Sequence, residues 1–338
     1  MKRHSALFRL GFLFLFLLVC LLLAVTIGTS GLSLDRLVSA TTEFLYRKQK
    51  LGPDEVILFQ IRFPRVILAA IVGSALAMAG VAFQAVLRNP LADPYIVGTS
   101  SGAALGATTA ILLHLGTSPA GFSWIPVFAF IGAVGAMFLV YSLARVGDKI
   151  PVETFLLAGV VVGALVWAMV SLLLTLTRTE LPRIIFWMMG SLQGADWLGV
   201  IVSAGYLIIG GIWLMLLANP LNLISVGEET AQHSGVQVER VKVSVVLAAS
   251  LITAAAVSVS GIIGFVGLVI PHTARMILGA DNRLLLPASA LIGAIFLIWC
   301  DTFSRVVFTP QEIPVGVITA LIGAPFFLLL LYKRRKLV

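Results

Sequence analysis

Asp301 and Arg305 are two ionisable residues inside an apolar segment. They lie four residues apart in the stretch WCDTFSR, so a helix would place them one turn apart on the same face. An ionisable residue within a membrane span is often functional, and a carboxylate is what an ion-coupled carrier would use. The alternative is a self-compensating pair at a helix end, which leaves little charge to drive a proton- or sodium-coupled cycle.

A second charged pair, Arg62 and Arg65, frames Pro64 at the start of a long apolar run. Proline suits the first turn of a helix, and the dipole at that end favours anions rather than two arginines. These cations therefore need some other partner. Two explanations stay open: they bind carboxylates of a protein that docks on the outer surface, or they snorkel toward lipid head groups.

Motifs for covalent chemistry are missing from the sequence. It contains no GxxxxGK[ST] phosphate loop, no HExxH, no GxSxG and no paired carboxylates at helical spacing within a span. Cys20 and Cys300 both fall in apolar runs, which predicts core residues rather than a disulfide or a metal site. We therefore expect a non-catalytic chain without a metal of its own, and any ATPase that powers it must be a separate chain.

The composition requires a membrane to position these residues. Of 338 residues, 59% are hydrophobic and 11% charged, and the mean hydropathy is +1.07. The apolar runs are continuous, which predicts spanning helices rather than a barrel. The net charge of +8 comes from cations placed between these runs rather than in one patch, which argues against nucleic-acid binding.

Ten spans fit the apolar runs, and 14 of the 23 lysines and arginines then lie on the inner side, which places both termini in the cytoplasm. The first run is too long for a signal peptide and predicts an uncleaved span. We expect a single transmembrane domain over 1–338, with the first span and a variable outer loop in 1–60 and a cytoplasmic segment in 218–242. The expected spans are 7–28, 63–87, 97–116, 124–146, 152–176, 197–217, 241–260, 262–279, 284–307 and 313–332.

Small residues dominate two stretches, GTSSGAALGA from Gly98 and VSVSGIIGFVGLVIPH ending at His272. In the second, glycines recur every three residues, which predicts a stripe for close helix approach, and Pro271 then removes a backbone hydrogen bond. Either tight packing or the lining of a solute pathway with flexible broken helices explains such stretches. The candidates are Gly98, Ser100, Ser101, Gly261, Gly264, Gly267 and Pro271.

The polar segment GEETAQHSGVQVERVK predicts a short helix, a turn at Gly235 and a second helix on the cytoplasmic side. A short amphipathic helix of this kind commonly lies on the membrane surface. It could equally be a protrusion that fits a cleft in a soluble partner.

Together these stretches resemble the FecCD-type permeases, the membrane subunits of bacterial ABC importers for iron–siderophore complexes, haem and cobalamin. The resemblance covers nearly everything after about Gln60. It is carried by RFPR, RNPLADPYIVGTSSGAALG, FWMMGSL, GEETAQHSGV, GFVGLVIPHTAR, NRLLLPASALIGAIFLIWCDTFSR and EIPVGVITALIGAPFFLLLLYK.

The resemblance implies an all-α, BtuC-like permease fold of about ten helices in the bacterial inner membrane. It also implies a second permease subunit, which we expect to be a copy of this chain, two cytoplasmic ATPase subunits that carry ATP and Mg, and an extracytoplasmic binding protein. The implied cargo is a metal chelate, an iron–siderophore first with haem or cobalamin next, and an oxyanion stays open. The rival hypothesis is an ion-coupled secondary transporter of a small solute.

The resemblance also assigns roles to individual residues. Arg62, Arg65 and Arg305 would present unpaired cations to carboxylates of the binding protein. Gly227, Glu228, Glu229, Ala231, Gly235 and Val236 would couple to the ATPase. Asn89 and Leu91, with Val152, Glu153 and Thr154, would form the cytoplasmic gate, although Val-Glu-Thr departs from the small hydroxyl residues expected there.

Overall fold

The computed structural model describes residues 2–28, 52–115 and 123–335, which are helical with short connections. The cations Arg36, Arg47, Lys48 and Lys50 of the predicted outer loop lie outside these ranges. The elements in chain order are α1 (Lys2–Thr26), α3 (Pro53–Val56), the π-helical turn η1 (Ile57–Arg62), α4 (Phe63–Val86), the 3-10 turn η2 (Pro94–Val97), α5 (Thr99–Leu112), α6 (Ile125–Ala144), α7 (Val152–Leu176), α8 (Leu181–Met188), α9 (Trp197–Leu216), α10 (Ala218–Val226), α11 (Glu228–His233), α12 (Val238–Ser260), α13 (Val266–Leu278), α14 (Asn282–Val306) and α15 (Val315–Arg335).

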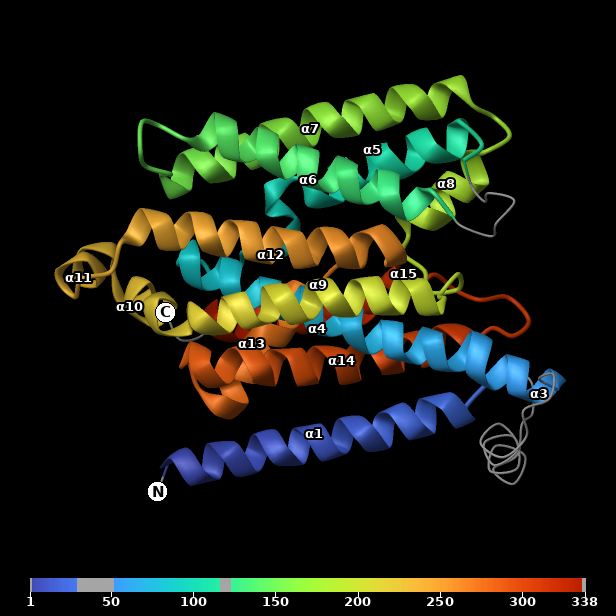
Figure 1. Cartoon of the computed structure of the whole chain (residues 1–338), viewed down its shortest axis with the longest axis horizontal. Helices are drawn as coiled ribbons and strands as arrows, with labels where there is room; N and C mark the ends of the chain where they lie inside the picture. Colours follow the sequence, from blue (N-terminus) through green and yellow to red (C-terminus); the bar gives the residue numbers. More distant parts are fainter. Residues whose placement is uncertain (1, 29–51, 116–122, 336–338) are drawn as a thin grey trace.

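The long helices run side by side along the longest axis of the molecule (Figure 1). Among the described residues, seven helices are long and apolar enough to cross a membrane, and each of the ten predicted spans corresponds to a helix. Because α5 and α13 have only 14 and 13 residues, they are too short to cross fully by themselves. Helix α1 begins and α15 ends at the end of the bundle that carries α10 and α11, as the charge distribution predicted (Figure 1).

Helix α4 lies at the centre and is packed by α14, α12, α13 and α9. It crosses α14 where glycines face each other: a Cβ added to Gly73 would lie 2.2 Å from the Gly293 carbonyl oxygen. Helices α5 and α6 approach as closely, since a Cβ on Gly102 would lie 2.2 Å from the Gly132 oxygen. The small residues after Gly98 therefore serve close helix packing.

The polypeptide is broken between α12 and α13. Helix α12 ends at Ser260, Gly261 follows at φ +66°, and α13 begins only at Val266. The Tyr95 hydroxyl donates to the Ile263 carbonyl at 3.0 Å and accepts from the Ile263 N–H at 3.1 Å, which pairs both backbone groups of that residue. Non-helical backbone among packed helices requires such partners.

This break corrects the predicted glycine stripe and the start of the span 262–279. Gly261 and Gly264 precede the helix, so they share no helical face with Gly267. Within α13, Gly267 makes a close contact, because its Cβ would meet the Pro94 ring at 2.4 Å. A Cβ on Gly261 would lie 2.1 Å from the Trp187 carbonyl oxygen of α8, whereas a Cβ on Gly264 would meet nothing within 4 Å. Three-residue spacing predicts a stripe only where the helix is continuous.

Candidate functional site

A buried charge cluster lies at the end of the bundle opposite α10 and α11. Asp301 is 1% exposed, and its carboxylate lies 2.9 Å from Arg65 Nε and 3.1 Å from Arg305 Nε. Glu312, in the connection after α14, binds Arg65 Nη1 at 2.9 Å. The self-compensating pair of Asp301 and Arg305 is confirmed. Arg65 of α4, 236 residues earlier in the chain, also binds Asp301.

The arginines of this cluster also hold the end of α1. Arg62 Nη1 donates to the Val25 carbonyl at 2.8 Å, and Arg305 donates to the Ala24 and Ile27 carbonyls at 3.2 Å each. The last carbonyls of a helix have no partner within it and carry the negative end of its dipole. Arginines from α14 and from the turn before α4 therefore cap the C-terminal end of α1.

These contacts correct one part of the sequence-based interpretation. Arg62, Arg65 and Arg305 are 5%, 6% and 6% exposed. Arg65 and Arg305 form ion pairs within the chain, so the expectation of unpaired cations is wrong for both of them. Snorkelling toward head groups is also wrong for side chains buried this deeply. Binding-protein docking at this cluster stays a prediction.

At the opposite end, 218–242 folds as predicted into α10, α11, a turn and the start of α12. Gly235 makes the turn at φ +83°, a left-handed conformation that favours glycine. Ile224, Ala231 and Val238 form a small core beneath it. Ala231 is fully buried, so of the predicted coupling residues it serves this core, while Glu229 and Gly235 are exposed and Gly227, Glu228 and Val236 are half-buried.

Polar contacts fix this segment to α14. Asn222 Nδ2 donates to Asp281 Oδ1 at 2.7 Å, and Asn222 Oδ1 accepts from the Asn282 N–H at 2.8 Å. Hydrogen bonds from Arg283 and Asn222 lower the pKa of Asp281 to about 2, although its partial burial acts in the opposite direction. Asp281 is therefore a carboxylate at any ordinary pH, and α10 is held at the base of the bundle.

The predicted cytoplasmic gate lies on two connections at this same end. Asn89 Oδ1 accepts from the Leu91 N–H at 2.9 Å, which shapes the turn after α4, and the Leu91 side chain is 47% exposed. Val152 and Thr154 are half-buried in the first turn of α7, and Glu153 is exposed there, where the helix dipole favours an acid. The gate function stays a prediction.

The remaining predicted pathway residues divide between packing and partial exposure. Ser101 is buried, and its hydroxyl donates to the Gly98 carbonyl at 3.0 Å; Pro271 is buried inside α13. Ser100 and Gly264 are half-buried. Packing therefore explains the buried residues Gly98, Ser101, Gly261, Gly267 and Pro271. Ser100 and Gly264 stay candidates for the lining of a pathway.

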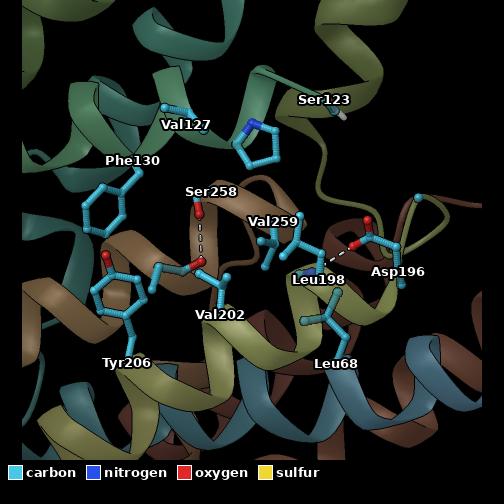
Figure 2. A pocket seen from close by; sticks show the side chains of 15 residues that line it. Leu68, Ser123, Val127, Phe130, Asp196, Leu198, Val202, Tyr206, Ser258 and Val259 are labelled. Atoms are coloured by element: carbon cyan, nitrogen blue, oxygen red, sulfur yellow. Dashed lines mark hydrogen bonds between the residues drawn. The ribbon is translucent and has the colours of Figure 1, made fainter. Parts of the chain in front are cut away.

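A groove that the sequence did not predict lies between α6, α9 and α12 and has a volume of about 360 Å³ (Figure 2). Its walls are mostly apolar, with Val127 of α6, Val202 of α9 and Val259 of α12. Phe130 and Tyr206 meet across it with ring centroids 5.1 Å apart (Figure 2). No spacing rule could reveal the groove, because its walls come from helices far apart in the chain.

Within residues 2–28, 52–115 and 123–335, no three His, Cys, Asp or Glu side chains lie close enough together to hold a metal ion. Both cysteines are buried and free. The charged groups instead gather at the two ends of the bundle.

The fold and these sites define a multi-spanning α-helical membrane transport protein. The chain belongs to the FecCD transport family, whose model matches residues 16–333. A structure described as a metal-chelate type ABC transporter in an inward-facing conformation superimposes with a TM-score of 0.82 at 34% identity, covering 96% of this chain and 99% of that one.

Two relatives show how far the similarity extends. The hemin transport system permease protein HmuU of Yersinia pestis is 39% identical, over 97% of this chain and 96% of its own length. The cobalamin import system permease protein BtuC of Halobacterium salinarum is 45% identical, over 83% of this chain and 74% of its own. Family and fold are thus as predicted from the motifs.

Proposed function

We propose that this chain is the transmembrane permease subunit of a binding-protein-dependent ABC importer that moves a metal chelate into the cytoplasm. Membership of the FecCD transport family over residues 16–333 carries the proposal. The names of the hemin and cobalamin relatives and the metal-chelate type of the superimposed transporter support the cargo class. Within that class, an iron–siderophore, haem and cobalamin are the candidates.

The proposal includes partners. A second permease subunit, a copy of this chain, would complete the pathway, and apolar side chains exposed along α7, such as Leu157, Val160, Leu165 and Leu172, offer a surface for it or for lipid. Two cytoplasmic ATPase subunits would bind ATP and Mg, and α10 and α11 would contact them. The location would be the bacterial inner membrane, with the binding protein on the outer side.

The outer docking role needs a refined form, because the three arginines are buried. The cluster brings Arg65 and Arg305 together with the carboxylates of Asp301 and Glu312, and Arg62 lies beside Arg305. Glu312 is 29% exposed and so lies nearest the surface. A carboxylate of the binding protein would approach there and compete with Glu312 for Arg65.

The alternative of an ion-coupled secondary transporter is less well supported. Such a carrier would use Asp301, but two arginines already neutralise that carboxylate. A coupling ion would have to displace a buried guanidinium before it could bind. The charge arrangement therefore favours an external energy source.

The experiment that tests the function uses the chain co-purified with its ATPase and reconstituted in liposomes. ATP hydrolysis and uptake are measured with each candidate binding protein, empty and loaded with an iron–siderophore, haem or cobalamin. Stimulation by one loaded binding protein supports the importer and identifies the cargo. Uptake that follows an imposed proton or sodium gradient without any ATPase would refute it.

A further inference from the structure

Lys242 is a buried cation at the cytoplasmic end of α12. Its side chain is 6% exposed, and Nζ lies 2.7 Å from Glu228 Oε2 and 3.1 Å from Glu239 Oε1. A lysine is rarely buried unless it is paired. Glu228 is the first residue of α11, whereas Glu239 lies in α12 with Lys242. The ion pair between Lys242 and Glu228 therefore joins α11 to α12.

The second oxygen of Glu239 continues the connection. Glu239 Oε2 accepts from the Ile150 N–H at 2.8 Å. Ile150 is 5% exposed and lies two residues before Val152, where α7 begins. A hydrogen bond to an ionised acceptor is among the stronger kinds. Glu239 thus fixes the backbone that leads directly into one predicted half of the cytoplasmic gate.

Glu228 also faces the other predicted half. Its Oε1 lies 3.7 Å from Nη2 of Arg88, the residue before Asn89. The Arg88 side chain is 46% exposed, so this contact is a weak surface pair. The buried route through Lys242 and Glu239 is therefore the one that can transmit a displacement.

We propose that Lys242 and Glu239 are positioning residues that connect the coupling segment, 218–242, to the connection before α7. The proposal rests on the proposed function, in which the ATPase moves that segment. Because Lys242 is almost fully buried, a shift of α11 must carry it along or break a desolvated ion pair. Glu239 would pass the same shift to Ile150 and so to the start of α7.

The test compares variants of the full complex in liposomes, with the number of ligand molecules imported per ATP hydrolysed as the readout. Glu239→Ala removes both the partner of Lys242 and the acceptor for Ile150. We expect the ratio to fall about tenfold, as a loss of about 1.4 kcal/mol in coupling would give, while ATP hydrolysis continues. Glu239→Gln keeps an oxygen for the Ile150 N–H, so its ratio should fall less.

A second variant and a control isolate the connection. Lys242→Gln keeps hydrogen-bond donors but leaves two carboxylates without their cation, and it should also lower the ratio. Asp281→Asn is the matched control, because it weakens a polar anchor of the same segment, to α14, that does not lead to α7. Its ratio should equal that of the unchanged chain. The ratio is counted per ATP, so a variant that merely lowers the amount of folded complex leaves it unaltered.

The outcomes separate this inference from the proposed function. A wild-type ratio in both Glu239→Ala and Lys242→Gln would overturn the inference, as would an equal fall in Asp281→Asn. If the unchanged complex imports nothing with ATP and any binding protein, the proposed function itself fails. A lowered ratio confined to the Glu239 and Lys242 variants supports the connection.

Discussion

Replacing Asp301 with Asn should strongly destabilise the protein. The carboxylate is 1% exposed and lies within 3.1 Å of a guanidinium nitrogen from each of Arg65 and Arg305. Asn keeps the shape but not the charge, so two buried cations would lose their shared anion. Breaking a buried ion pair on one side typically costs about 3–5 kcal/mol. We expect a loss in this range, reduced where Glu312 still neutralises Arg65.

The assay is equilibrium unfolding in mixed detergent micelles followed by tryptophan fluorescence. Trp299 lies two residues before Asp301, and its indole N–H contacts Cys20 Sγ of α1 at 3.3 Å, so its emission also reports the release of α1. Glu312→Gln is the control, because Glu312 is 29% exposed and Asp301 still pairs with Arg65 in that variant, so we expect a smaller loss than for Asp301→Asn.

A double-mutant cycle with Arg305→Gln tests the reasoning further. If the Asp301–Arg305 ion pair stabilises the protein, the double variant should lose less unfolding free energy than the two single variants together, by at least about 1 kcal/mol. Strict additivity, or an Asp301→Asn variant within about 1 kcal/mol of the unchanged protein, would refute the argument that this carboxylate holds the cluster together.

Three further predictions concern other contacts. Tyr95→Phe leaves the Ile263 N–H and carbonyl without their partner and should lower the unfolding free energy by about 1–3 kcal/mol in the same assay; an unchanged value would mean that the break needs no such tie. Gly267→Ala pushes a methyl group into the Pro94 ring and should cost about 1–3 kcal/mol, whereas Gly264→Ala, which meets no atom within 4 Å, should cost almost nothing. Because the pKa of Asp281 is lowered to about 2 from 3.8, its contribution is present above about pH 4 and is lost as the pH falls toward 2; Asp281→Asn should abolish this part of the acid dependence, measured as unfolding free energy against pH.

The sequence predicted those features that depend on residues close together in the chain. Hydropathy located the helices, and the spacing of Asp301 and Arg305 identified a pair within one helix. The composition around Gly235 predicted the helix, turn and helix on the cytoplasmic side. Each of these needs only a window of a few residues to be recognised.

The features that it did not predict join distant segments or depend on a local backbone choice. Arg65 meets Asp301 across 236 residues, and the Glu239 carboxylate meets Ile150 across 89. No periodicity encodes such contacts. The predicted spans separate at Gly261, where α12 ends, but the start of α13 was placed four residues too early. Phe265, a bulky residue, adopts φ +68°, a conformation that sequence rules reserve mainly for glycine.

The hydrogen bonds that cap the C-terminal end of α1 have a consequence for biosynthesis. Its final carbonyls are bound by Arg305, and the two partners are 278 residues apart in the chain at Ile27. At about 5–20 residues per second, the ribosome needs roughly 14–56 seconds to synthesise the intervening chain. Arg62 follows Val25 by only 37 residues, so its hydrogen bond to the end of α1 can form early in synthesis. The bonds from Arg305 can form only after α14 has been made, so the end of α1 acquires its full set of partners near the end of synthesis.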